Sequence, residues 1–404
     1  MTGMDSYCDR TPSPAFMNLG NLAAPCDLAN ITPIQYAYDP VPDASRYLDP
    51  KLSKFPSVAK KSNLSISRNT TLLHPLEAGL PYRSSLDGVR ESRHWRSNLI
   101  ATVKVLNLLA ADNNAADIEV DHGLTVGKLA KKELRPGLES RVVLATPYMF
   151  PSADERRIEM IAVLMILYFV FDDKVEETSD STLRPSRDDF MCRLKGDDTS
   201  EPTGSELQRH IDSILRSIEE EDEIEGNGGR DMIAALRRAF KCVHPQGDFE
   251  TVNSYLDFRN ENVGAAFVIA AAKFSIRSSV DSSDPRFTRY LNLIGNHLGL
   301  INDLASYEKE LRAVKMGETT DMINAVAVIK RLLSLPTERA AKVATYAYQL
   351  QLENWIMEEL ERLADHEDLT DEEWWFLEAV FLTATGNTFF CMVASRYGGE
   401  AARL

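Results

Sequence analysis

From about residue 85 onward, apolar residues recur at positions i, i+3, i+4 and i+7, a spacing that places them on one face of an α-helix. Alternation of apolar and polar positions, which is typical of β-strands, is nearly missing from the sequence. We therefore expect an all-α protein. The helices are predicted near residues 92–111, 154–177, 205–221, 230–242, 248–276, 285–315, 319–333, 337–364 and 370–397.

Two of these predicted helices are apolar on nearly every side. One carries MIAVLMILYFVF at 160–171, and the other carries AAFVIAAA at 265–272. A helix without a polar face is normally covered by other helices. We expect both helices to be central in an α-helical bundle, with any functional cavity between them.

Composition changes along the chain and indicates two regions. Residues 1–75 are rich in Ser, Pro, Asn and Thr with weak periodicity, which predicts an irregular and flexible N-terminal extension that serves as a solvated linker. Residues 76–404 are expected to form one helical catalytic domain. The sequence leaves open whether the extension covers an active site or is dispensable.

Net charge and cysteine usage exclude several classes of protein. The 45 Lys and Arg against 61 Asp and Glu give a net charge of -16, which argues against nucleic-acid or anionic-lipid partners. The apolar stretch 160–171 is too short to span a bilayer. The 5 cysteines are far apart and odd in number. We expect a reduced, cytoplasmic protein without stable membrane insertion, and its oligomeric state stays open.

Common catalytic signatures for nucleotide binding, serine hydrolysis and zinc proteases (GxGxxG, GxxxxGK[ST], GxSxG and HExxH) do not occur in the sequence. The 7 histidines are scattered without pairing four residues apart. Any metal site is therefore expected to use oxygen ligands.

Two groups of polar residues have the spacing of oxygen ligands for a hard cation such as Mg²⁺. Asp172, Asp173 and Glu176 follow the apolar stretch in FDDKVEE, and carboxylates three or four positions apart share a helix face. Taken alone, this acidic motif is more often a solvated helix end. Because it continues an otherwise buried helix, we expect it at the rim of a cavity.

The second group is Asn302, Ser306 and Glu310 in INDLASYEKE, each four residues after the last. Steps of four residues advance only ~40° around a helix, so the amide oxygen, hydroxyl and carboxylate form one row that can hold one ion. An NxxxSxxxE pattern taken alone is more often a row of polar side chains that faces solvent. Lys309 beside the row and the second acidic motif favour the metal interpretation.

The two motifs together resemble the acidic motif and the NSE motif of class I terpene synthases, and NDLASYEKE is the more specific of the two. SYLDFRN, which contains Arg259, resembles the segment with the diphosphate-sensing arginine of that family. Arg396 and Tyr397 resemble its C-terminal RY pair. The resemblance covers roughly residues 140–400 and is similar to microbial, particularly fungal, sesquiterpene cyclases.

This resemblance implies an α-helical bundle around a central apolar cavity that ionises farnesyl diphosphate with Mg²⁺, three ions in number, and cyclises the carbocation. Diphosphate would be bound by Arg259, Lys309, Arg396 and Tyr397. The metal ligands would come from Asp172, Asp173, Glu176, Asn302, Ser306 and Glu310. Such cations are needed because a chain of this net charge repels an anionic substrate.

Departures from the family pattern and two rival functions remain. The acidic motif ends in Glu176 without a third aspartate, and the glycine after Arg259 is Gly264, later than usual, so the position of the helix break is open. A prenyl chain-elongating transferase shares the fold but carries a second Asp-rich motif in place of NDLASYEKE. A non-catalytic isoprenoid-diphosphate-binding protein is the other alternative.

Aromatic residues that precede two of the motifs are candidates for lining the cavity. Tyr168 and Phe169 lie four and three residues before Asp172, one turn deeper, where their rings can face a carbocation. Phe389 and Phe390 each lie seven residues before the corresponding member of the RY pair, where they too could line the cavity. Core packing is the ordinary role for each. The sequence does not determine the product skeleton.

Overall fold

A computed structural model describes residues 31–113, 119–121, 124–175, 204–242, 248–317 and 322–399, and side chains are not described for 119–124 and 171–175. The all-α prediction is confirmed. The long helices are α3 (Trp95–Ala111), α7 (Glu155–Val175), α9 (Glu206–Glu225), α10 (Gly229–Ala239), α11 (Val252–Asn262), α12 (Ala265–Ser275), α13 (Thr288–Met316), α15 (Glu338–His366) and α16 (Asp371–Val393). Shorter helices are α2 (Leu64–Asn69), α5 (Val126–Glu133), α6 (Ala145–Met149) and α14 (Ala325–Leu332).

Strands are confined to two small antiparallel ribbons in the described part of the chain. β1 (Thr70–Leu72) pairs with β2 (Arg90–Ser92), and β3 (Glu119–Asp121) pairs with β4 (Leu124–Thr125). Three single-turn 3₁₀ helices complete the elements, at Ala44–Arg46, Leu138–Ser140 and Val142–Leu144. The ribbons attach loops to the bundle and contribute little to the core.

The helix ends follow ordinary capping chemistry. Ser205 and Thr370 each begin a helix, α9 and α16, with a reciprocal capping box that pairs the cap with the side chain of Gln208 or Glu373. Gly226 ends α9 in the left-handed conformation, with φ of 61°. These local signals explain why most helix boundaries fall within a few residues of the predicted ones.

The structure locates the helix break whose position the sequence left open, because the helical segment predicted over 248–276 is two helices. α11 ends at Asn262 and α12 begins at Ala265, with Gly264 between them at φ of 69°. An added Cβ at Gly264 would lie 2.8 Å from the Tyr168 hydroxyl oxygen. Both the positive φ and the contact select glycine here.

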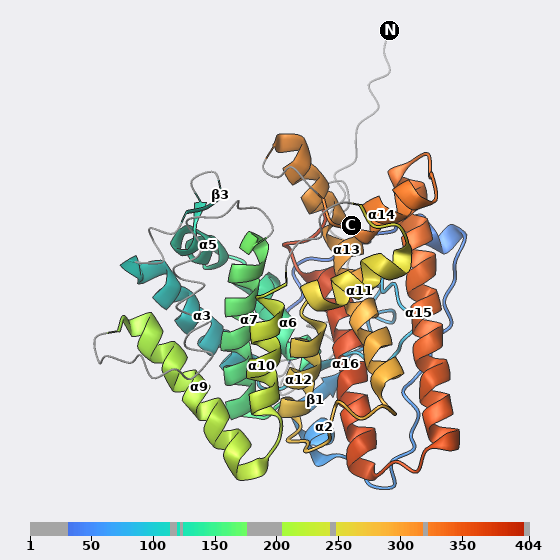
Figure 1. The fold of residues 1–404 in the computed structure, drawn as a ribbon. Coiled ribbons are helices and arrows are strands. Elements are labelled where there is room, and N and C mark those ends of the chain that lie inside the picture. The colour runs from blue at the N-terminus through green and yellow to red at the C-terminus, as the bar shows by residue number, and fades with distance from the viewer. Residues whose placement is uncertain are drawn as a thin grey trace.

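Helices α7, α12, α13 and α16 form the interior of the bundle, flanked by α3, α10 and α15 (Figure 1). Residues 160–170 of α7 are buried apart from the partly exposed Phe169, and α12 is buried along nearly its whole length. Helix α16 is long and apolar enough to cross a membrane, but 94% of its apolar window is buried inside the protein. Its hydrophobicity is therefore that of a core helix.

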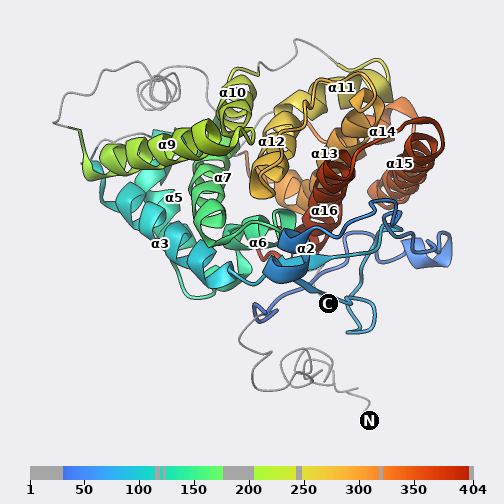
Figure 2. The same cartoon turned by 90° about the horizontal axis from the view of Figure 1, so that it is seen from below.

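The segment from residue 31 to 75, which was expected to be a solvated linker, lies along the side of the bundle near α15 and α16 (Figure 2). Tyr38 and Val41 are buried, and Trp375 Nε1 donates to the Lys61 carbonyl at 3.0 Å. The expectation is thus corrected for this part, because its scattered apolar residues find partners on distant helices. Residues 1–30 lie outside the described part, and the domain boundary at 75/76 stays a prediction.

Candidate active site

The row predicted on the later helix lies on α13, one of the interior helices of the bundle. Asn302 and Glu310 are partly exposed, whereas Ser306 between them is buried. Glu310 Oε2 accepts a hydrogen bond of 2.9 Å from Asn324 Nδ2, at the start of α14. The loop before α14 therefore holds one end of the row in place.

Arg259, at the end of α11, is buried against the other end of this row. Its Nη2 donates to Asn302 Oδ1 at 2.8 Å, and its Nε donates to Asp303 Oδ1 at 3.0 Å. The guanidinium also donates to Asn262 in its own last turn. This arginine thus joins the break between α11 and α12 to the polar row of α13.

Arg396 and Tyr397, which follow the end of α16, lie at the same end of the row as Arg259. Tyr397 is buried, and its hydroxyl accepts a hydrogen bond of 3.0 Å from Asn302 Nδ2. Arg259, Asn302 and Tyr397 come from three separate segments and form one hydrogen-bonded chain. The side chain of Asn302 links them, because its amide has both a donor and an acceptor.

Aromatic rings from α7 and α16 adjoin this chain. The Arg396 guanidinium lies 5.0 Å from the centre of the Phe169 ring, a cation–π distance. The Phe390 ring centre is 6.1 Å from that of Phe169 and 5.6 Å from that of Tyr397. Phe169 and Phe390 are therefore next to the RY pair. Phe389 packs edge to face on Tyr148 instead, at 4.8 Å.

Tyr168 contacts the break between α11 and α12. Its hydroxyl donates to the Asn262 carbonyl at 3.1 Å, and its ring packs among Phe240 and Phe267 at 5.8 and 5.7 Å. The residue is buried. A hydrogen bond from α7 thus holds the last carbonyl of α11, one turn before the acidic motif begins.

The acidic motif is only partly within the described structure. Asp172 and Asp173 lie in the last turn of α7, where backbone but not side chains is described, and Glu176 lies outside the described residues. Since Tyr168 and Phe169 contact the helix break and the RY pair, this turn of α7 is at the same end of the bundle. That end is the upper one in Figure 1, where the C-terminus also lies.

The donor set of the row fits a hard cation. Ser306 Oγ is fully enclosed and makes no hydrogen bond of ordinary geometry within the described residues, although it is near enough to lower the pKa of Glu310. Burial nonetheless raises that pKa to about 7, and the charge of Asp303 acts in the same direction. A cation would stabilise the Glu310 carboxylate and give the Ser306 oxygen a partner.

Clusters of His, Cys, Asp and Glu do not offer another metal site in the part of the chain that is described: no group of three is close enough to hold an ion. A metal site among the described residues would therefore also need amide and hydroxyl oxygens, which Asn302 and Ser306 provide. Asn302 Oδ1 has two lone pairs, so it can accept from Arg259 and still face an ion. Lys309 is partly exposed on α13, beside the row.

Comparisons with known proteins agree with this geometry. Residues 164–348 match the family model described as terpene synthase family 2, C-terminal metal binding. The chain is 28% identical over 380 residues to Terpene cyclase 6 of Gibberella fujikuroi, covering 92% of this chain and 96% of the relative. The resemblance to class I terpene synthases that the motifs indicated is confirmed. The matched family model is that of a metal-binding domain, which supports binding of a divalent metal and of a small isoprenoid diphosphate.

A second relative agrees with this resemblance, and solved structures agree with the fold. The chain is 24% identical over 379 residues to Terpene cyclase aneC of Aspergillus aculeatus, covering 92% of this chain and 83% of the relative. Its fold matches aristolochene synthase from Penicillium roqueforti with a TM-score of 0.54 at 16% identity, over 70% of this chain and 93% of that one. It also matches a-eudesmol synthase with a TM-score of 0.55 at 14% identity, over 74% and 95%.

Three residues that organise the candidate site were not predicted from the sequence. Asp303 is fully buried and accepts hydrogen bonds from Arg259, the Tyr255 hydroxyl and the Ala325 backbone N–H. Asn324 donates to the Asp303 carbonyl as well as to Glu310. Asp303 and Tyr255 had a visible signal, because they stand inside NDLASYEKE and SYLDFRN. Their contacts, like those of Asn324, still depend on how α11 and α14 pack on α13.

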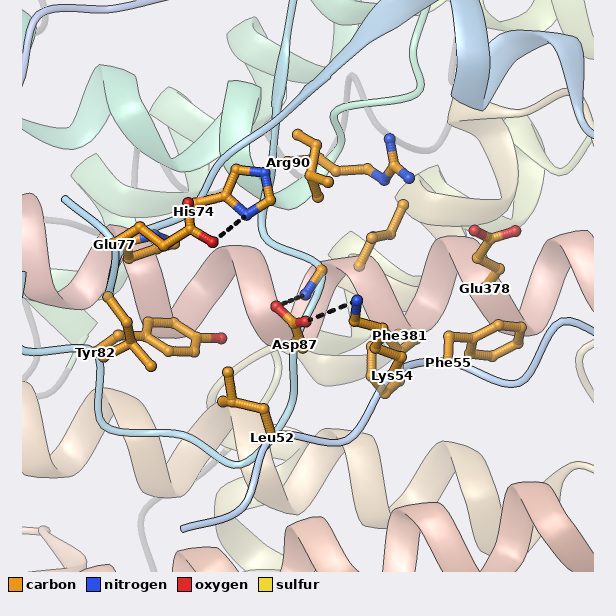
Figure 3. A pocket seen from close by; sticks show the side chains of 15 residues that line it. Leu52, Lys54, Phe55, His74, Glu77, Tyr82, Asp87, Arg90, Glu378 and Phe381 are labelled. Carbon is orange, nitrogen blue, oxygen red and sulfur yellow. Dashed lines mark hydrogen bonds and ion pairs between the residues drawn. The ribbon is translucent and has the colours of Figure 1, made fainter. Parts of the chain in front are cut away.

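A cavity of about 420 Å³ lies elsewhere, between the N-terminal segment and the first half of α16 (Figure 3). Phe55 and Phe381 form part of its apolar wall. Its rim contains an ion pair between Lys54 Nζ and Asp87 Oδ2 at 3.7 Å. None of the predicted site residues lines it. The cavity is therefore a surface feature separate from the proposed site.

Proposed function

We propose that this protein is a sesquiterpene synthase that ionises farnesyl diphosphate with three Mg²⁺ ions and cyclises the resulting carbocation to a cyclic sesquiterpene. The observation that carries the proposal is the hydrogen-bonded chain from Arg259 through Asn302 to Tyr397. It brings the predicted sensor arginine, the metal row and the RY pair together, although they lie in three parts of the sequence.

The site has the two parts that this reaction needs. Arg259, Lys309 and Arg396 would supply positive charge to the diphosphate, and the Tyr397 hydroxyl a neutral hydrogen bond. Mg²⁺ held by Asn302, Ser306 and Glu310, with Asp172, Asp173 and Glu176, would neutralise the leaving anion. The allylic C–O bond breaks, and its electron pair leaves with the diphosphate.

The carbocation left behind needs an apolar surrounding without nucleophiles. Phe169 and Phe390 lie beside the RY pair and present π faces. Aromatic rings stabilise positive charge without reacting with it. Tyr168 is tied to the Asn262 carbonyl, so we assign it to holding the helix break more than to the cation.

The sesquiterpene assignment is also supported by the relatives. The solved structures of similar fold are aristolochene synthase and a-eudesmol synthase, and a further relative of 26% identity is an aristolochene synthase of Penicillium expansum. A neutral serine in place of a second Asp-rich motif disfavours the prenyl transferase. The reduced, cytoplasmic location stays a prediction.

The proposal is tested by incubating the protein with farnesyl diphosphate and Mg²⁺ and analysing volatile products by gas chromatography and mass spectrometry. Parallel arms use geranyl and geranylgeranyl diphosphate, and farnesyl diphosphate with isopentenyl diphosphate. We expect a cyclic C15 hydrocarbon or alcohol from farnesyl diphosphate, and no turnover with EDTA. Longer diphosphates in the last arm would establish the transferase instead.

The row is tested by the triple variant Asn302→Ala, Ser306→Ala, Glu310→Ala. Its diphosphate release should fall to background, and each single variant should lose nearly as much because the three act as a unit. Glu361→Ala, an exposed carboxylate on α15, is the matched control and should behave like the parent. If the triple variant turned over substrate at the parental rate, the three side chains would be ordinary polar residues of the helix surface without a role in metal binding.

A further inference from the structure

The N-terminal segment of residues 31–41 is bonded to the very elements that carry the proposed site. Tyr38 is buried, and its hydroxyl donates to the Ala305 carbonyl on α13 at 2.7 Å. Its backbone N–H donates to the Met392 carbonyl on α16 at 3.1 Å. One residue therefore contacts both the helix of the metal row and α16, the helix that precedes the RY pair.

The Ala305 carbonyl also receives a bond from the far end of the chain. The Gly398 N–H donates to it at 3.2 Å, directly after Tyr397. Gly398 has φ of 69°, and an added Cβ would lie 2.9 Å from a ring carbon of Tyr38. Residues from both termini thus meet at one carbonyl, immediately before Ser306.

Tyr36 acts on the same loop from the other side. Its hydroxyl donates to the Tyr397 carbonyl at 2.9 Å, and its ring centre lies 5.8 Å from that of Tyr38. The peptide unit between Tyr397 and Gly398 is therefore held at its carbonyl by Tyr36 and at its N–H by the Ala305 carbonyl. Its side chain can then reach Asn302 at 3.0 Å.

The segment has anchors that do not involve these two hydroxyls. The Thr32 N–H donates to both carboxyl oxygens of buried Glu91, at 3.0 and 3.1 Å. Asp39 forms an ion pair with Arg83. Removing a tyrosine hydroxyl should therefore leave the segment attached while releasing its hold on α13 and the C-terminal loop.

From these contacts we propose that Tyr38 and Tyr36 are positioning residues, which fix the RY pair against the metal row of α13 and so set the rate of ionisation. The inference rests on the proposed function, since it assigns the row and the pair to diphosphate departure. Neither tyrosine hydroxyl bonds Phe169 or Phe390, the rings that the proposed function assigns to the carbocation. Their loss should therefore slow ionisation without redirecting the cation.

The test compares Tyr38→Phe and Tyr36→Phe with Tyr290→Phe. Tyr290 is a matched control because its buried hydroxyl also crosses from α13 to α16, donating to the Leu377 carbonyl at 2.8 Å. Measurements are the rate of diphosphate release, the Mg²⁺ concentration at half-maximal rate, the product ratio, and the rise in melting temperature caused by Mg²⁺ with inorganic diphosphate.

We expect Tyr38→Phe to lower kcat by about tenfold or more, because a displacement of the order of 1 Å at a reacting centre has effects of this size. The Mg²⁺ requirement should rise, the ligand-induced melting shift should shrink, and the product ratio should stay parental. Tyr36→Phe should show a smaller change of the same kind. Tyr290→Phe should keep parental kcat and Mg²⁺ requirement.

Equal losses in the Tyr38 and Tyr290 variants would overturn the proposal, since a general loss of packing would then explain both. A changed product ratio at parental rate would also overturn it, because Tyr38 would then act on the cavity. If Tyr38→Phe does not fold, the same comparison is made between Tyr36→Phe and Tyr290→Phe, and equal losses in those two variants would overturn the proposal. A parent without turnover or a melting shift with Mg²⁺ and diphosphate would instead remove the proposed function itself.

Discussion

Replacing Arg259 by methionine tests whether this arginine acts on diphosphate or only on the fold. The guanidinium Nη2 lies 2.9 Å from Asp303 Oδ1, and the two side chains are 8% and 0% exposed. Methionine keeps most of the apolar stem but leaves the Asp303 carboxylate without its positive partner. The substitution therefore has a structural cost that is separate from any catalytic one.

The size of that cost follows from the burial of the pair. Removing one member of a buried ion pair costs about 3–5 kcal/mol, because the other charge stays desolvated. Asp303 keeps the Tyr255 hydroxyl and the Ala325 N–H as donors, so we expect a loss near the lower end, about 3 kcal/mol. Exposed Arg46, 3.8 Å from Asp43, should lose under about 1 kcal/mol on the same change.

The double variant Arg259→Met, Asp303→Asn separates the two roles. Asparagine removes the buried charge, so the double variant should be more stable than Arg259→Met alone, with a coupling of about 1–3 kcal/mol. Unfolding in urea, followed by circular dichroism, gives these free energies. Turnover should stay lost in the double variant if Arg259 binds the diphosphate.

Two results would refute this reasoning. A loss below about 1 kcal/mol in Arg259→Met would show that the ion pair is not a structural element. Recovery of diphosphate release in the stabilised double variant would show that Arg259 is needed for the fold alone. In that case the sensor role would be wrong while the family assignment stands.

Three further changes have defined outcomes. Tyr168→Phe loses the bond to the Asn262 carbonyl and should lower the free energy of unfolding by about 1 kcal/mol and reduce diphosphate release, measured by urea unfolding and a phosphate-coupled assay. Phe169→Leu should change the product ratio more than the total diphosphate released, and an unchanged ratio would contradict its place beside the cation path. Burial raises the pKa of Glu91 to about 8, so its protonated form stabilises the fold at low pH and that stability falls as pH rises from about 4.5 towards 8. Glu91→Gln should flatten this decline in melting temperature, and an equally steep decline would mean that another group causes it.

Much of the fold followed from local pattern in the sequence. The helical period, the capping residues and the turn sequences act over four residues or fewer, so they are visible without a structure. The same holds for Asn302, Ser306 and Glu310, whose alignment depends only on the geometry of one helix. The nearly uniform apolarity of the stretches in α7 and α12 also indicated central helices, and their described residues are largely buried.

Only the tertiary structure decided how the parts of the site meet. The break at Gly264 depends on the approach of Tyr168, which is 94 residues from the carbonyl it bonds. Asp303 was a neighbour of a motif residue in the sequence, and burial makes it the counter-ion of Arg259. Tyr36 and Tyr38 lie in a segment that reads as a linker, yet their bonds cross separations of 361 and 267 residues. Hydrogen bonds of this kind leave no periodic trace, because their partners are brought together by the packing of whole helices, and that packing is decided by the complete core.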